Sequence, residues 1–310
     1  MIWKTELSID APVRRPLASR PRAPLSGNRE THRSRSPWSV ALTGLTRSFE
    51  TTLIGKTLRR SLRKACTVTP VEVYLSRGDR DLDGMRIAML SDLHLGFYFS
   101  GVEFLALAQE VSAWSPDLVC LVGDLVDDRM EEFDMARTGL AALASRRPVF
   151  AVPGNHEYHA DFTLNRFLSV VEDAGGVTLL NRGHRFHRGN SSLWICGVDD
   201  LLCGEPDLES ALTGMKEDEP ALLLSHHPDL FCEAAHCGID LTFSGHTHGG
   251  QITWFGNPLL PKAHYTRVGY WKGSHAMEGS QLLVGRGAGV CVLPFRIGAP
   301  PEVLMIELRR

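Results

Sequence analysis

The stretch "LTFSGHTHGGQI" (residues 241–252) places two histidines, His246 and His248, directly after a short apolar run. Apolar residues within a short span bounded by turn formers predict a buried strand, and Gly245 predicts its end. The two histidines then lie on a loop at the carboxyl end of that strand. Imidazoles at this spacing are either polar residues of a tight turn or metal ligands, and this stretch alone does not decide between them.

The charge of the chain is divided unequally along its length. Residues 1–66 contain 14 Lys and Arg against 4 Asp and Glu, a net charge of +10. Residues 67–310 contain 19 basic against 32 acidic residues, a net charge of about −13. Proteins bind nucleic acid mainly by neutralising its phosphates, so the larger part of the chain is not expected to bind nucleic acid.

The seven cysteines predict reduced thiols rather than a disulfide framework. Their number is odd, no C-x-x-C occurs, and Cys120, Cys196 and Cys291 lie within apolar runs. This usage is typical of a cytoplasmic protein. No run of 18 apolar residues occurs either, so no transmembrane helix is expected.

The first 69 residues are predicted to form two segments that precede the main domain. Residues 1–37 form a basic tail rich in Arg, Pro and Ser, which is expected to be disordered. Residues 38–69 form an amphipathic basic helical segment, with an apolar stripe over 38–53 and a basic cluster over 56–64. Residues 38–66 either bind an anionic membrane surface, which would hold the protein at the inner face of the membrane, or pack on the main domain.

Residues 70–310 are predicted to form one α/β domain. Helices are expected over 104–111 and 131–145, and strands over 85–92, 117–124, 148–155, 192–198, 221–226, 239–246, 281–285, 290–295 and 302–308. Alternation of strands with helices predicts parallel sheet covered by helices, and the closely spaced C-terminal strands predict antiparallel additions. The predicted fold is a layered α/β sandwich.

Five of the predicted strands end in Asp, Asn or His. These polar residues are Asp92 and His94, Asp124, Asn155 and His156, His226, and His246 with His248. One such residue is usually a helix cap, but five strand ends with these residues are hard to explain as caps. In α/β sheets the carboxyl ends of the strands meet at one crevice. Carboxylate, amide and imidazole ligands together suit Mn, Fe or Zn better than Ca or Mg.

The blocks "DLH" (92–94), "GDLVD" (123–127), "GNHE" (154–157), "SHHP" (225–228) and "GHTH" (245–248) occur in an order that resembles the calcineurin-like metallophosphoesterases. The resemblance implies a four-layer sandwich of two mixed β-sheets flanked by helices. It also implies two divalent metal ions, with Mn²⁺ expected and Fe or Zn as alternatives. By the family pattern one metal is bound by Asp92, His94 and His248, the second by Asn155, His226 and His246, and both by Asp124.

The same resemblance assigns catalytic roles to two further residues. His156 is implied to protonate the leaving oxygen or to stabilise charge on phosphorus, and Asp127 is implied to orient His156. A helix N-cap before residues 131–145 is the alternative for Asp127. The implied reaction is hydrolysis of a phosphodiester or pyrophosphate bond by in-line attack of a hydroxide that bridges two metals.

Within the family, the chain most resembles the bacterial membrane-associated branch, which includes phosphodiesterases and UDP-2,3-diacylglucosamine pyrophosphatases of lipid A synthesis. Lipid-linked or nucleotide-linked substrates are therefore expected. Asp128 stands where protein phosphatases of the family carry Arg, which disfavours phosphomonoesters. A non-catalytic scaffold is the alternative from another class, but such proteins typically lose ligands or the catalytic histidine. The "FYF" run (97–99) is either core or an apolar lip beside the metals.

Overall fold

The computed structural model describes residues 66–310 except 78–79, 97, 128, 160–162 and 260–265, together with residues 52, 56, 57 and 61. The predicted tail over 1–37 and nearly all of the helical segment over 38–69 lie outside the described residues, so both stay predictions. Among the described residues, no helix combines the length and the apolar character needed to span a bilayer.

The first sheet has six strands in the order β1-β14-β2-β3-β4-β5. Strands β2, β3, β4 and β5 are parallel, β14 is antiparallel to β2, and β1 is parallel to β14. The bounds are β1 Thr67–Tyr74, β2 Arg86–Leu90, β3 Leu118–Val122, β4 Val149–Val152, β5 Val177–Thr178 and β14 Glu302–Arg309. Every residue of β3 and β4 is buried, as expected for parallel strands that are covered on both faces.

The second sheet also has six strands, in the order β12-β13-β9-β8-β7-β6. Its centre, β7–β8–β9–β13, is parallel, and an antiparallel strand closes each edge. The bounds are β6 Arg182–Arg188, β7 Ser191–Gly197, β8 Ala221–Leu224, β9 Leu241–Ser244, β12 Gly273–Met277 and β13 Ser280–Val284. A separate hairpin pairs β10 Thr253–Trp254 with β11 Asn257–Pro258.

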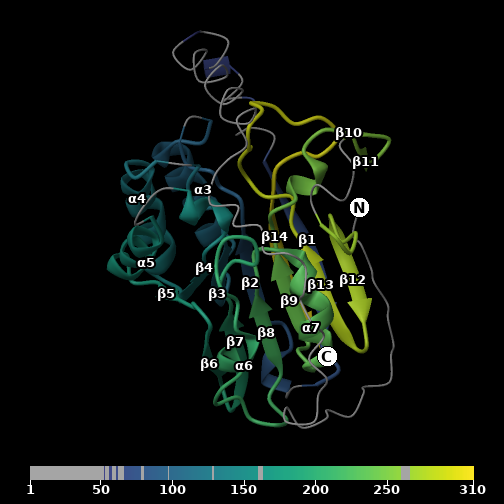
Figure 1. The fold of residues 1–310 in the computed structure, drawn as a ribbon. Helices are drawn as coiled ribbons and strands as arrows, with labels where there is room; N and C mark the ends of the chain where they lie inside the picture. The colour runs from purple at the N-terminus through teal and green to yellow at the C-terminus, as the bar shows by residue number, and fades with distance from the viewer. Residues whose placement is uncertain are drawn as a thin grey trace.

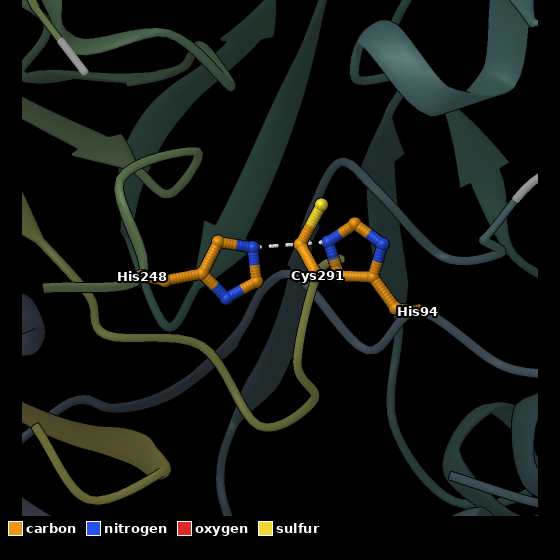
Figure 2. Close-up of side chains that lie close together, drawn as sticks. All are labelled: His94, His248 and Cys291. Atoms are coloured by element: carbon orange, nitrogen blue, oxygen red, sulfur yellow. Dashed lines mark hydrogen bonds between the residues drawn. The ribbon is translucent and has the colours of Figure 1, made fainter. Parts of the chain in front are cut away.

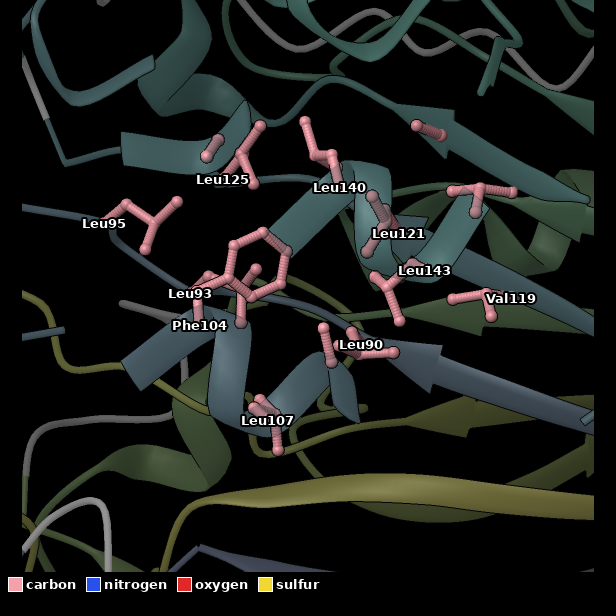
Figure 3. Packing of buried hydrophobic residues seen from close by; sticks show 14 of the residues in the cluster. Leu90, Leu93, Leu95, Phe104, Leu107, Val119, Leu121, Leu125, Leu140 and Leu143 are labelled. Carbon is pink, nitrogen blue, oxygen red and sulfur yellow. The ribbon is translucent and has the colours of Figure 1, made fainter. Parts of the chain in front are cut away.

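Helices cover the outer faces of the two sheets, which gives four layers (Figure 1). The first sheet packs on α3 Gly101–Ala113, α4 Glu132–Ala144 and α5 Thr163–Asp173 through a cluster that includes Phe104, Leu121 and Leu140 (Figure 3). The second packs on α6 Leu208–Ala211 and α7 Phe231–His236. A further cluster of buried apolar residues lies between the sheets and includes Ile87, Phe150, Leu224 and Phe243; it is here called the interior cluster. Short 3-10 helices occupy Arg80–Leu82, Asn155–Tyr158, Pro228–Leu230 and His248–Gly250.

The four-layer sandwich of two mixed sheets flanked by helices is therefore confirmed, but the boundary at residue 70 is wrong. Thr67, Val68 and Thr69, predicted as the end of a helical segment, begin β1 by pairing with β14. Pro70, the first residue of the predicted domain, lies inside this strand. Because β1 is an edge strand, the N–H that proline lacks is not needed by a second neighbour.

The strand predicted over 290–295 is also wrong, because these residues form a loop. The main-chain groups of this run bind the side chain of Gln251 and not a neighbouring strand. The Gln251 NH₂ donates to the carbonyls of Cys291 and Leu293, and its Oε1 accepts from the Cys291 N–H. Val292 has a φ of 61°, which a β-branched residue rarely adopts and which no strand contains. The apolar run therefore covers one end of the sandwich instead of extending a sheet.

The run "FYF" divides between core and surface. Phe99 is only 2% exposed and belongs to the cluster beneath α3, so it is not part of an apolar lip. Tyr98 is half-buried, and Phe97 lies outside the described residues.

Candidate metal centre

The seven predicted metal ligands all follow carboxyl ends of parallel strands in the two sheets. Asp92 and His94 follow β2, Asp124 follows β3, and Asn155 follows β4. From the second sheet, His226 follows β8, and His246 and His248 follow β9. The two sets face each other across the same end of the sandwich, so the structure brings together all seven side chains that the sequence selected.

The first group comprises Asp92, His94, Asp124 and His248. The Nε2 atoms of His94 and His248 lie 3.0 Å apart, and their rings stack at 4.9 Å between centroids (Figure 2). His94 Nε2 lies 3.5 Å from Asp124 Oδ2, and His248 Nε2 lies 3.6 Å from Asp92 Oδ1. All four side chains are buried.

The second group comprises Asp124, Asn155, His226 and His246. His226 Nε2 lies 3.2 Å from Asp124 Oδ2, and His246 Nδ1 lies 3.0 Å from Asn155 Oδ1. His226 Nδ1 donates to the carbonyl of Val122 at 2.8 Å, which leaves Nε2 as the atom with a lone pair facing the carboxylate. Asp124 Oδ2 thus lies within 3.5 Å of imidazoles from both groups, as a bridging ligand requires.

The ligands lie on turns of unusual backbone conformation. Asp92, His94, Asp124, His246 and His248 have φ between 44° and 68°, the left-handed region that residues other than glycine rarely occupy. Each such residue costs about 1–3 kcal/mol, and such residues concentrate at functional sites. These turns direct the side chains from the strand ends toward the facing sheet.

Three glycines allow the ligand turns to approach each other. A Cβ on Gly123 would lie 2.4 Å from His226 Nδ1, one on Gly154 would lie 2.3 Å from Asp124 Oδ1, and one on Gly245 would lie 2.3 Å from Asp92 Oδ2. Each glycine precedes a ligand and contacts a ligand from another strand. Gly249 and Gly250, which follow His248, pack on Arg286, Pro258 and Trp271.

These residues fit a pair of divalent cations. Within the described part of the chain, the buried atoms Asp92 Oδ2, His94 Nδ1 and His226 Nε2 have no hydrogen-bond partner. Burying a carboxylate oxygen without a partner is costly, and a cation would satisfy Asp92 Oδ2. Asp124, His226 and His246 form one set of donor atoms within 4.8 Å of one another, and His94 with Asp124 belongs to a second.

The electrostatics of the centre also suit cations. Burial opposes ionisation of Asp124, but the nearby imidazoles of His226 and His156 hold its pKa well below the ordinary value. Burial lowers the pKa of His246 to about 3 and that of His248 well below its usual range. Burial opposes protonation of His226, but the charge of Asp124 raises its pKa well above the ordinary value, so a cation that binds this imidazole must displace a proton.

His156 lies beside the predicted metal ligands, and Asp127 holds its ring through the main-chain carbonyl and not through the carboxylate. His156 Nδ1 donates to the main-chain carbonyl of Asp127, while the Asp127 carboxylate lies 3.7 Å from both His156 Nδ1 and His94 Nδ1. His156 Nε2 therefore faces the centre, 4.0 Å from Asp124 Oδ2. The N-cap alternative for Asp127 is wrong, because α4 begins at Glu132 with Glu131 in the cap position.

Two further histidines, His159 and His227, lie against this site. The His159 ring packs on His156 at 4.2 Å between centroids, and His227 packs on His246 at 4.4 Å. His227 is buried and accepts a hydrogen bond from the Asp229 N–H. Both support the rings of predicted site residues.

Glu157, which sequence reasoning left without a role, joins the two central ligand turns. Its fully buried carboxylate accepts hydrogen bonds from the N–H groups of Asp124 at 3.0 Å, Leu125 at 2.8 Å and Gly154 at 2.6 Å. Burial, together with the charge of Asp124, raises the pKa of Glu157 to about 7. Its position in the "GNHE" block indicated that Glu157 belongs to the site. No sequence pattern shows which main-chain groups its carboxylate binds.

Replacing Glu157 with Gln should destabilise the protein, because one acceptor oxygen becomes an NH₂ that faces main-chain donors. Leaving buried donors without an acceptor costs about 1–3 kcal/mol for each group. We expect the free energy of unfolding, measured by urea titration, to fall by about 2–4 kcal/mol. The exposed Asp134, replaced by Asn, is the control and should leave stability nearly unchanged. Equal stability of both variants would contradict this role.

Comparison with known proteins agrees with this geometry. Residues 85–250 match the family model "Calcineurin-like phosphoesterase". The uncharacterized metallophosphoesterase YkuE of Bacillus subtilis is 30% identical over 233 residues, which cover 73% of this chain and 80% of YkuE. An uncharacterized metallophosphoesterase of Helicobacter pylori (strain J99) is 34% identical over 245 residues, which are 76% of this chain but only 62% of that protein.

Among solved structures, a dimetal phosphatase from Danio rerio aligns with 73% of this chain and 99% of its own, at 12% identity and a TM-score of 0.40. This score is too low to support a conclusion about function. The match of the family model to more than half of the chain, and the identity to YkuE, do not depend on it. The chain therefore belongs to the calcineurin-like phosphoesterase family and is a metal-dependent phosphoric ester hydrolase.

Proposed function

We propose that the enzyme hydrolyses a phosphodiester or pyrophosphate bond in a lipid-linked substrate at the cytoplasmic face of an anionic membrane. The observation that carries the hydrolytic part is that Asp124 lies within 3.5 Å of an imidazole from each sheet, His94 and His226, with His156 beside it. When bound, two divalent cations supply Lewis acidity at the phosphoryl group and acidify a water molecule.

The protein groups provide orientation and proton transfer. Asp127 fixes the His156 ring through its carbonyl, so Nε2 is the atom available to a phosphoryl or leaving oxygen. Burial lowers the pKa of His156 well below its ordinary value in the absence of substrate. A bound phosphate ester adds negative charge beside the ring, which raises the pKa again and favours the protonated acid.

We propose a diester or pyrophosphate over a monoester because of the residue that follows the block "GDLVD" (123–127). Asp128 occupies the position of the arginine that binds phosphate in the protein phosphatases of the family. Without that arginine, the second negative charge of a monoester lacks a cationic partner, whereas a diester carries one charge on phosphorus. The globular charge of about −13 likewise disfavours a nucleic acid as the diester.

The hairpin β10–β11 supports the membrane part of the proposal. It begins five residues after His248, and Figure 1 shows it projecting beyond the sheets. At its tip Trp254 is 67% exposed and Phe255 is 90% exposed, with their rings 5.2 Å apart. Lys272 Nζ donates to the carbonyl of Gly256 in the same turn. Exposed aromatic rings beside a lysine suit the interface of an anionic membrane.

The test compares soluble and membrane substrates. Full-length protein with Mn²⁺ should hydrolyse bis-p-nitrophenyl phosphate at least about 10-fold faster than p-nitrophenyl phosphate, and should cleave UDP-2,3-diacylglucosamine in anionic vesicles. A variant with Trp254→Ser and Phe255→Ser should lose about 10-fold or more of vesicle binding and lipid turnover, since burying each ring contributes about 1.5–3 kcal/mol. Its turnover of the soluble diester should stay within about threefold of wild type.

Met135→Ser, which alters an exposed apolar residue on α4, is the control and should change neither activity. If wild-type protein hydrolyses the soluble diester but ignores vesicles even at low salt, a soluble diester is the substrate. If it cleaves no diester when metal-loaded, the proposed reaction is wrong.

A further inference from the structure

Cys291 lies at the metal centre, although it belongs to none of the five sequence blocks. Its Sγ lies within 4.8 Å of the ring nitrogens of His94 and His248, and the three atoms form a set that could hold one cation (Figure 2). Asp92, whose Oδ1 lies 3.6 Å from His248 Nε2, is fully buried, and its Oδ2 has no hydrogen-bond partner among the described residues. The Sγ also lies 3.7 Å from His156 Nε2.

The loop that carries Cys291 is fastened to both ligand turns of this site. The N–H of Gly289 donates to the carbonyl of Asp92 at 2.8 Å. Gln251, three residues after His248, binds the N–H and the carbonyl of Cys291 at 3.1 and 3.0 Å. Arg296 donates to His248 Nδ1 at 3.0 Å and to the carbonyls of His248 and Gly289. The position of the thiol is therefore set by the same turns that position the ligands.

We infer that Cys291 is a sulfur ligand of the metal bound by Asp92, His94 and His248, a role that rests on the proposed dinuclear centre. Coordination takes the thiolate form, so binding releases the thiol proton to solvent. The second site has only nitrogen and oxygen donors: Asp124, Asn155, His226 and His246. Sulfur ligands select Zn²⁺ and Fe²⁺ over Mn²⁺, whereas the second set accepts Mn²⁺ readily. The two sites thus differ in metal preference.

Cobalt titration of the full-length protein tests this inference. Co²⁺ at two equivalents should give visible ligand-field bands from both sites and a thiolate-to-cobalt charge-transfer band in the near ultraviolet. Cys291→Ser should abolish the charge-transfer band while the ligand-field bands remain. It should also weaken Zn²⁺ binding at one site by at least about 10–100-fold, the loss typical even of an outer-sphere partner. Cys203→Ser, a change outside the centre, should keep the band.

Each outcome separates the inference from the function on which it rests. Ligand-field bands without a charge-transfer band in wild type would overturn the sulfur ligand and leave the two-metal centre standing. A charge-transfer band that survives in folded Cys291→Ser would also overturn it, because another cysteine would then be the ligand. Absence of any cobalt band would overturn the centre itself. Circular dichroism of the variants establishes that they are folded.

Discussion

Asp124→Asn should lose most of both metals and reduce turnover by about 10³-fold or more. Asp124 Oδ2 is the only carboxylate oxygen here with imidazoles of both metal groups within 3.5 Å, among the described residues. Asn keeps the size of the side chain and an acceptor for the His156 N–H, but removes the charge that both cations require. A bound metal contributes several kcal/mol to the transition state, and each 1.36 kcal/mol corresponds to a factor of ten in rate.

The measurement is elemental analysis after metal loading and gel filtration, together with turnover of the soluble diester. Asp92→Asn is the matched control, because Asp92 is predicted to serve one metal only and should lose about one equivalent. Retention of two tightly bound metals by Asp124→Asn would contradict its bridging role.

His156→Gln should lower turnover by about 10²–10⁴-fold while metal content stays near that of the wild type. The Nε2 of His156 faces the centre from outside the two proposed ligand groups, and glutamine cannot carry the transferred proton. The geometry alone leaves a competing assignment, since His156 also forms a possible ligand set with His94 and Asp124. Metal content and rate, measured on the same sample, separate the two roles.

His159→Gln is the control for this change, because the His159 ring contacts His156 without joining any predicted ligand set. Its turnover should stay within about 10-fold of wild type. A parallel loss of metal and activity in His156→Gln would show that His156 is a ligand and not the acid.

The placement of the candidate ligands could be predicted from the sequence because each follows a buried strand whose end is marked by glycine or a polar residue. Asp92, Asp124 and His226 lie where the apolar runs stop, and parallel pairing then brings the strand ends together. What the pattern could not show is contact between main-chain groups and distant side chains. Glu157, Gln251 and Arg296 act on turns that are remote in sequence, and their partners appear only once the chain is folded.

The errors have the same origin. Residues 290–295 are apolar enough for a strand, but their main-chain groups bind Gln251 instead of a neighbouring strand. Pro70 looks like a boundary in the sequence, but an edge strand accommodates it. Local composition thus predicted which segments are buried. It predicted less reliably which partners the main-chain groups of those segments bind.

The division of the ligands between two sheets has a consequence for biosynthesis. Asp92, His94, Asp124 and Asn155 come from strands made early, whereas His226, His246 and His248 are made more than 70 residues later. A chain emerging from the ribosome at first holds three of the four donors of the first group and two of the four donors of the second. Tight metal binding, and with it hydrolysis, must therefore wait until the second sheet docks across the interior cluster. Metal loading is then a late step that stabilises the completed four-layer fold. A truncated or misassembled chain does not bind the cations that hydrolysis requires.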